Sequence, residues 1–300
     1  MPVALITGTS TGIGLETALL FARKGYQVYA CARTPASSEG LQRAVADGLP
    51  IVPLALDVDS DESVRDALGQ VGAVDVLVNN AGIGSTAPME LMPLSEIRTL
   101  FETNVFGAVR VMQAVLPSMR TRRSGVVVNV TSMMGRITLP GHGAYAATKF
   151  ALSAISESLA MEMKPFNVRV AMIEPGVILT PIWNKRTVPL PEGHEYGAVM
   201  GRLFRVFGAQ MEGGTLPDAV ATAIYDAATR PDSPVRIPVG ADAEVVAAGR
   251  ENMTVDEWVS LYAEPDEETF VTRAQQAFGV DMLNPPSLNA RRHHATPELT

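Results

Sequence analysis

Short apolar runs alternate with amphipathic stretches along most of the chain. Runs of this kind, rich in Val, Ile and Leu, are typical of strands buried on both faces of a parallel sheet. They are found at Val3–Thr7, Gln27–Arg33, Ile51–Val58, Val74–Asn79, Val126–Thr131, Val168–Ile173 and Val235–Val239. Apolar residues recur at helical spacing between the runs, so helices are expected to join the strands. The pattern predicts an α/β fold: one doubly wound parallel sheet of about seven strands with helices on both faces.

The alternation of apolar runs and amphipathic stretches ends after the sixth predicted strand. Residues 180–217 are rich in proline, glycine, methionine and aromatic residues, with an apolar helical patch around Val199, Leu203, Phe204 and Phe207. Ligands of open α/β sheets bind beyond the carboxyl ends of the strands, where an insertion at this point could close over them. We interpret residues 181–217 as a lid. An ordinary packed helical hairpin is the alternative.

The composition argues against several classes of partner. With 24 basic and 32 acidic residues, the formal net charge of −8 disfavours a polyanion such as DNA. The single cysteine, Cys31, cannot form an intrachain disulfide, and no basic segment precedes the first apolar run, so a cytoplasmic protein is expected. No apolar stretch reaches the roughly 18 residues of a membrane span. No Cys, His and carboxylate cluster has metal spacing, so no metal is expected.

The loop after the first strand reads Thr-Gly-Thr-Ser-Thr-Gly-Ile-Gly over residues 7–14. Glycines between a strand and a helix allow a tight turn, let the backbone approach a pyrophosphate and direct the helix N-terminus at its charge. A Rossmann-type dinucleotide site is therefore expected from Gly8, Thr9, Ser10, Thr11, Gly12, Ile13 and Gly14. The spacing differs from the commoner Gly-x-Gly-x-x-Gly. A glycine-rich turn without a ligand is the alternative.

The end of the second strand bears on the choice between NAD(H) and NADP(H). Sheets that prefer NAD carry an acidic residue there, which accepts hydrogen bonds from the adenosine ribose. Here the strand ends with Ala32 and Arg33, and an arginine can pair with a 2′-phosphate and stack on adenine. NADP(H) is therefore predicted over NAD(H). An exposed arginine without a ligand is the alternative.

Three further residues have the spacing of a proton-transfer site. Tyr145 and Lys149 lie four apart in a helical segment, so the ammonium can sit close to the phenol. A nearby cation favours the phenolate and brings a tyrosine pKa of roughly 10 towards the operating pH. Ser132, at a strand end, would hold the substrate oxygen. Each residue alone is uninformative, but the set behind the glycine loop predicts a hydride-transfer enzyme.

With these motifs, about residues 2–240 resemble the short-chain dehydrogenase/reductase family. The resemblance implies that Tyr145 is the general acid or base, that Ser132 orients the substrate oxygen, and that Lys149 lowers the tyrosine pKa and binds the nicotinamide ribose. Asn104, in Thr-Asn-Val-Phe-Gly, matches the family's helix-interrupting asparagine, whose side chain would hold a water in a proton path. The implied catalytic set is Asn104, Ser132, Tyr145 and Lys149.

The resemblance also extends the cofactor site. Beyond the glycine loop and Arg33 it implies contacts from Asp57, Val58, Asn80, Ala81, Gly82, Tyr145, Lys149, Pro175, Gly176, Val177 and Thr180. Asp57 would bond the adenine amino group, and the Val177 backbone and Thr180 hydroxyl would bond the nicotinamide amide. Thr11 stands where the family's second basic determinant of NADP(H) preference would be.

The implied substrate comes from likeness to one branch, that of 17β-hydroxysteroid and retinol dehydrogenases and their bacterial relatives. Residues 28–35 and 238–243 carry this likeness, which suits a bulky apolar alcohol or ketone, steroid-like or retinoid-like. Substrate contacts are expected from Ser132, Met134, His142, Tyr145 and Trp183, in a pocket with Met133, Leu139, Ile182, Met200 and Phe204. For His142, packing against its own loop is the alternative.

The expected reaction is hydride transfer between NADP(H) and a carbonyl or secondary alcohol. Two alternatives stay open: the same fold catalysing dehydration or epimerisation through a transient hydride, and a cofactor-binding sensor without turnover. Family members commonly pair through the helices that carry Asn104 and Tyr145, so a homodimer or homotetramer is expected.

A single domain is expected over residues 1–300. Residues 1–180 would form the cofactor-binding and catalytic core, 181–217 the substrate lid, and 218–243 the last helix and seventh strand. Residues 244–300 would form a C-terminal extension, helical and amphipathic from Glu244 to about Phe278. From Asn284 onward the chain has the composition of a disordered tail.

Overall fold

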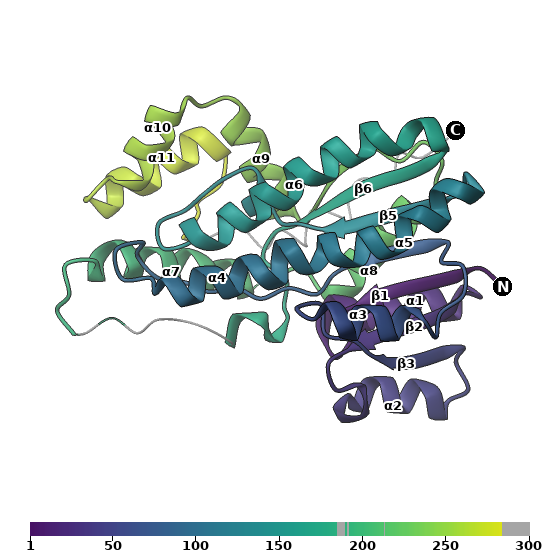
Figure 1. Ribbon diagram of the computed structural model, residues 1–300. Helices are drawn as coiled ribbons and strands as arrows, with labels where there is room; N and C mark the ends of the chain where they lie inside the picture. The colour runs from purple at the N-terminus through teal and green to yellow at the C-terminus, as the bar shows by residue number, and fades with distance from the viewer. Residues whose placement is uncertain (185–189, 191, 213, 284–300) are drawn as a thin grey trace, which may run out of the picture.

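The computed structural model describes residues 1–184, 190, 192–212 and 214–283. Its centre is a seven-stranded parallel sheet with the strand order β3-β2-β1-β4-β5-β6-β7 (Figure 1). The strands are β1 Val3–Thr7, β2 Gln27–Ala32, β3 Ile51–Ala55, β4 Val76–Asn79, β5 Gly125–Val130, β6 Val168–Pro175 and β7 Arg236–Val239. Each overlaps a predicted strand, so the predicted sheet is confirmed. The strand order reverses between β1 and β4, which opens a crevice at their carboxyl ends.

Helices cover both faces because neighbouring side chains of each strand point to opposite sides. Ile6 packs in one apolar layer with Phe21 and Ile224, whereas the adjacent Leu5 packs in the other with Val111 and Leu152. The first layer contains α1 Gly12–Arg23, α2 Glu39–Ala46 and α8 Pro217–Thr229. The second contains α3 Asp61–Leu68, α5 Ala108–Arg122 and α6 Gly143–Met163, with α4 Leu94–Phe101 against α6.

Short helical turns mark several of the connections. A π-helical segment, η2 Glu102–Gly107, joins α4 to α5. The 3₁₀ turns are η1 Pro35–Ser37, η3 Met133–Gly135, η4 Lys164–Phe166 and η5 Pro181–Asn184. Of these, η1, η3 and η5 follow the carboxyl ends of strands, whereas η4 precedes β6. The η2 segment contains Asn104, at the point where the resemblance implies an interrupted helix.

The C-terminal part adds a third apolar cluster beyond the ends of the strands. It is formed by α7 Gly197–Glu212, α9 Ala241–Glu251, α10 Val255–Tyr262 and α11 Glu267–Phe278, which gather past the strand ends in Figure 1. Phe207, Trp258 and Phe270 are buried there against Met133 of η3. The predicted helical extension is confirmed, as three helices; Thr254 and Asp266 cap the second and third. The predicted tail lies outside the described residues.

Candidate active site

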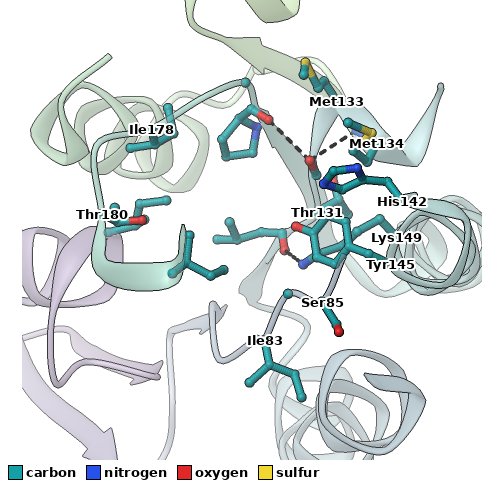
Figure 2. A pocket seen from close by; sticks show the side chains of 18 of the residues that line it. Ile83, Ser85, Thr131, Met133, Met134, His142, Tyr145, Lys149, Ile178 and Thr180 are labelled. Carbon is teal, nitrogen blue, oxygen red and sulfur yellow. Dashed lines mark hydrogen bonds between the residues drawn. The ribbon is translucent and has the colours of Figure 1, made fainter. Parts of the chain in front are cut away.

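Two adjoining pockets form one cleft at the carboxyl ends of the strands. The first, about 1350 Å³ including space open to solvent, is lined by the glycine loop and the ends of β2 and β3. The second, about 980 Å³ counted in the same way, is lined by Ser132, Tyr145 and Lys149 (Figure 2). Both pockets share the residues Ile13, Asn80, Gly82, Ile83, Thr180 and Ile182. A ligand on the glycine loop can therefore extend to Ser132 and Tyr145.

The glycine loop has the shape that an anion requires. Gly8 and Gly12 have φ of +69° and +60°, which only glycine adopts at low cost. A Cβ on Gly14 would stand 2.3 Å from the Gly8 carbonyl oxygen, so α1 can begin this close to the loop only without one. No side chain caps the N-terminus of α1 at Thr11. The first amides of α1 are thus left for a phosphate.

Two predicted cofactor residues hold the loop in place. Asn80 Nδ2 donates to Thr7 O at 2.9 Å and to Gly8 O at 3.1 Å. Thr9 is fully buried and donates through Oγ1 to Cys31 O at 3.1 Å. Thr9 therefore supports the loop from behind and does not line the cleft, whereas Asn80 lines both pockets.

The far end of the first pocket carries the predicted adenosine contacts. Arg33 is exposed at its rim, and Asp57 and Val58 line its wall. Asp59, which the sequence did not single out, lines it as well; its Oδ2 accepts from Thr103 Oγ1 at 2.9 Å. Burial raises the pKa of Asp59, and the charge of Arg33 partly opposes this. Arg33 and Asp59 thus line the same part of the cleft.

Ser132 and Tyr145 meet in the second pocket. Ser132 follows β5 and caps η3: its Oγ accepts from the Met134 amide at 3.1 Å and donates to Pro175 O at 3.4 Å. Tyr145 lies in the first turn of α6, partly exposed to the cleft, and Lys149 follows one turn later. The predicted catalytic side chains are thus brought together from β5 and α6.

Asn104 braces the site from the π-helical segment. Its Nδ2 donates to Ile83 O at 2.9 Å and to Thr148 Oγ1 at 3.0 Å, and its Oδ1 accepts from the Ile83 amide at 2.8 Å. Both amide donors are therefore engaged by the protein, and the side chain joins the loop after β4 to α6. A Cβ on Gly82 would stand 3.3 Å from Asn104 Oδ1 and 3.7 Å from Lys149 Nζ.

Burial is the largest influence on the pKa values of Tyr145 and Lys149. It raises the pKa of Tyr145 to about 12, against a lowering by the hydrogen bond to Ser132, and lowers the pKa of Lys149 to about 8. Lys149 Nζ bonds Val130 O at 3.1 Å and lies 5.7 Å from the centre of the Tyr145 ring. A lowering of the tyrosine pKa by Lys149 stays a prediction.

The segment after β6 contains the residues predicted to contact the nicotinamide. The Val177 amide donates to Asp242 Oδ2 at 2.6 Å, so it is engaged within the protein, whereas among the described residues the Val177 carbonyl accepts only from the Thr215 amide at 3.3 Å and keeps one lone pair. The Val177 side chain is buried in the C-terminal cluster. Ile178, which the sequence reasoning missed, lines the pocket with Pro175, Gly176 and Thr180. Alternation of side chains along an extended segment is the signal that could have found it.

The substrate end of the pocket is largely apolar. Met133, Met134 and Ile182 line it as expected, and so does Phe207 of α7. The other predicted wall residues lie elsewhere: Leu139 and Met200 line a separate surface groove, and Phe204 is 47% exposed because it lies on the outer side of α7. The side chain of Trp183 lies outside the described residues.

Three polar residues join this wall. His142 lines the pocket as predicted; it is buried, and desolvation lowers its pKa to about 4. Ser85 and Thr86, on the loop after β4, line it too and were missed by sequence reasoning. Figure 2 shows Ser85 and Ile83 on the side of the pocket that carries this loop, and His142, Tyr145 and Lys149 on the side of α6.

Neither a metal-binding cluster nor a membrane-spanning helix is found among the described residues. No group of three or more His, Cys, Asp or Glu side chains in this part of the chain is placed to hold a metal ion. No helix within the same ranges is long and apolar enough to cross a membrane.

A protein family and several named proteins have sequences similar to this one. The short chain dehydrogenase family matches residues 2–189. The chain is 44% identical to retinol dehydrogenase 8 of Homo sapiens over 182 residues, which are 59% of this chain and 58% of that protein. It thus spans less than two thirds of that relative. It is 34% identical to 3-ketodihydrosphingosine reductase of Bacteroides thetaiotaomicron over 252 residues, which are 82% of this chain and 90% of that protein.

Solved structures share the fold. A short-chain dehydrogenase from Streptomyces avermitilis superposes with a TM-score of 0.76 at 34% identity, over 86% of this chain and 95% of that one. A short chain dehydrogenase from Burkholderia cenocepacia in complex with NADP superposes with a TM-score of 0.70 at 25% identity, over 88% of this chain and 98% of that one. The fold defines the class, that of the α/β proteins with a doubly wound, Rossmann-type sheet. The chain belongs to the short-chain dehydrogenase family.

Proposed function

We propose that the protein is an NADP(H)-dependent oxidoreductase that transfers a hydride between a nicotinamide and a carbonyl or secondary alcohol. The observation that carries this proposal is the shared wall of the two pockets. Asn80, Gly82 and Thr180 line both, so one dinucleotide seated on the glycine loop would end beside Ser132 and Tyr145. The uncapped start of α1 and the glycines that leave no room for a Cβ fit its pyrophosphate.

The residues of the site have separate duties in this reaction. When bound, NADPH supplies the hydride. Ser132 Oγ holds the carbonyl oxygen, and the Tyr145 hydroxyl, which keeps its proton at neutral pH, donates it to that oxygen. Lys149 lies on the same face of α6, where it would bind the nicotinamide ribose. Asn104 fixes the loop after β4 against α6, which keeps Ile83 and Gly82 at the junction of the pockets.

The preference for NADP(H) is supported by charge. Arg33 lies at the rim of the first pocket and the strand end beside it carries Ala32, not a carboxylate that would repel a 2′-phosphate. The Burkholderia relative was solved with NADP. Of the loop contacts implied by resemblance, Ser10, Thr11 and Ile13 line this pocket, as does Ala81.

The proposed substrate is a bulky apolar alcohol or ketone. Met133, Met134, Ile178 and Phe207 support this because their side chains offer a wide hydrophobic wall. Relatives named for retinol and for 3-ketodihydrosphingosine agree with it. We further propose that residues 181–217 act as the substrate lid, to which Ile182 and Phe207 contribute the described contacts.

Assembly and location complete the proposal. Phe106 and Phe150 are 53% and 44% exposed on the helical segments that follow Asn104 and Tyr145, which supports a homodimer or homotetramer through these surfaces. Light scattering of the purified protein tests this. We propose a cytoplasmic location, in line with the single, buried thiol of Cys31.

Oxidation of NADPH against a panel of ketones tests the function. We expect turnover, with a higher kcat/KM for steroid-sized and retinoid-sized carbonyl compounds than for acetone or butanone. Turnover of the small ketones alone would show that the apolar assignment is wrong. The absence of any NADPH oxidation would contradict net hydride transfer and favour an epimerase, a dehydratase or a sensor.

A further inference from the structure

The substrate pocket contains a polar pair that the proposed reaction does not use. Thr86 and His142 line this pocket together with apolar residues, and neither has a role in the proposed hydride transfer. Burial of an imidazole is costly unless its nitrogens are hydrogen-bonded. Both ring nitrogens of His142 have partners, and the partners determine what the pair can offer to a ligand.

His142 is held in one tautomer. Its Nδ1 lies 3.4 Å from Pro140 O, and a carbonyl oxygen can only accept, so Nδ1 carries the proton. Nε2 is therefore an acceptor. With 6% of its surface exposed and a pKa lowered to about 4 by desolvation, the ring stays neutral at physiological pH.

The acceptor Nε2 determines the orientation of the Thr86 hydroxyl. Thr86 Oγ1 lies 3.3 Å from Nε2, so the hydroxyl proton is directed at the ring. The Thr86 methyl group faces the Gly141 turn, where it lies 3.5 Å from the position that a Cβ would take. Lone pairs of Oγ1 are thus left for a ligand, while its proton is not.

The backbone fixes this acceptor relative to the catalytic phenol. The His142 amide donates to Leu139 O at 3.1 Å, and the His142 carbonyl accepts from the Ala146 amide at 2.8 Å. The ring packs on Phe207 with 5.1 Å between centroids. His142 precedes Tyr145 by three residues at the start of α6, so the two side chains belong to one rigid unit.

We propose that Thr86, oriented by His142, is a second anchor for the substrate: its hydroxyl oxygen accepts a hydrogen bond from a hydroxyl or N–H group away from the reacting carbon. This inference rests on the proposed function and narrows its substrate class. The substrate is an apolar ketone or alcohol that carries one further hydrogen-bond donor. A second carbonyl, which only accepts, does not fit the pair.

A matched set of straight-chain ketones tests the anchor. It contains a parent ketone, its analogues with one hydroxyl at successive carbons, and the corresponding diketones. With NADPH, at least one hydroxyketone exceeds the parent in kcat/KM by about tenfold, the effect of one neutral hydrogen bond, and no diketone does. Equal kcat/KM for the parent and every hydroxyketone overturns the proposal.

Variants separate the anchor from general packing. Thr86→Val keeps the shape and removes the oxygen, so it lowers kcat/KM about tenfold more for the preferred hydroxyketone than for the parent. Thr86→Ser keeps the hydroxyl and retains the preference. In His142→Phe the Thr86 hydroxyl no longer donates to the ring and can donate to a ligand, so the kcat/KM of a diketone rises relative to that of the parent ketone. The assignment is contradicted if Thr86→Val lowers kcat/KM equally for the hydroxyketone and the parent ketone. It is also contradicted if His142→Phe raises the kcat/KM of no diketone relative to that of the parent.

Failure of the proposed function would be visible separately. If no ketone of the set is turned over, the oxidoreductase proposal fails. Calorimetric Kd values for the same compounds in the presence of NADP⁺ then decide whether Thr86 is an anchor for the ligand. A hydroxyketone that binds about tenfold more tightly than its parent to the wild type, and no more tightly to Thr86→Val, supports it. Equal Kd values in the wild type overturn it.

Discussion

Lys149 Nζ donates to Val130 O at 3.1 Å and lies 5.7 Å from the centre of the Tyr145 ring. The ammonium is thus held by the end of β5, and the phenol is left to face the cleft. With burial raising the pKa of Tyr145 to about 12, the phenol carries its proton at neutral pH. This arrangement suits Tyr145 to protonate a carbonyl oxygen during reduction.

Tyr145→Phe removes this proton donor and keeps the ring. We expect kcat for ketone reduction to fall by about 10²–10⁴-fold, while the Kd of NADPH from a fluorescence titration stays near the wild-type value. Tyr26→Phe is the matched control, because Tyr26 packs against Phe21 and Tyr225 far from the cleft and should leave kcat unchanged. Undiminished kcat in Tyr145→Phe would falsify the assigned role.

Arg33→Ala tests the source of the cofactor preference. Loss of a charge-assisted contact to the 2′-phosphate should raise the Kd of NADPH by about tenfold or more and leave the Kd of NADH nearly unchanged. Arg43→Ala, an exposed arginine of α2, serves as the control. Equal changes in the Kd of NADPH and the Kd of NADH would mean that Arg33 does not bind the 2′-phosphate.

Gly14→Ala tests the close approach of α1 to the loop. Its Cβ would stand 2.3 Å from Gly8 O and 2.5 Å from Asn80 Nδ2, so the loop must move. We expect a loss of about 1–3 kcal/mol in the free energy of unfolding, as for overpacked sites, and weaker NADPH binding. Gly72→Ala is the control, since a Cβ there meets no atom within 4 Å and should change stability by less than about 0.5 kcal/mol. Similar stability in both variants would contradict the geometry.

The stability of the protein should fall in mild acid because of His142. Burial lowers its pKa from 6.5 to about 4, so as the pH falls below 6.5 the unfolded chain takes up a proton that the folded protein does not. Unfolding is thereby favoured, by up to about 3 kcal/mol near pH 4. His142→Phe should lose less stability over this range. Urea unfolding at several pH values checks this, and identical pH slopes in the two proteins would exclude His142 as the cause.

Much of the fold was predictable because its information is local. A strand covered on both faces must be an apolar run, and helical spacing between the runs fixes the crossovers. The proposed catalytic residues were predictable for the same reason: Ser132 follows a strand, and Tyr145 and Lys149 are one helical turn apart. The residues of the glycine loop are contiguous in the sequence, so the loop can be recognised without knowing how distant segments pack.

The rest depends on how distant segments meet. Phe204 and Phe207 are both apolar and lie three apart on α7, and only the docking of that helix decides that Phe207 faces the pocket. Thr86 reaches His142 because the Ala87 amide bonds Gly141 O at 2.9 Å, a contact between segments more than fifty residues apart. The Val177 amide is taken by Asp242, far along the chain. No short pattern encodes such pairings.

Transfer of deuterium is the most direct test of the central claim. The protein would be incubated with NADPH that carries deuterium at both positions of the reactive carbon of the nicotinamide and with a bulky apolar ketone, and the alcohol would be analysed by mass spectrometry. Hydride transfer in this cleft predicts an alcohol that carries one deuterium on the carbinol carbon. An alcohol without deuterium, or no alcohol from any ketone of the panel, would contradict it.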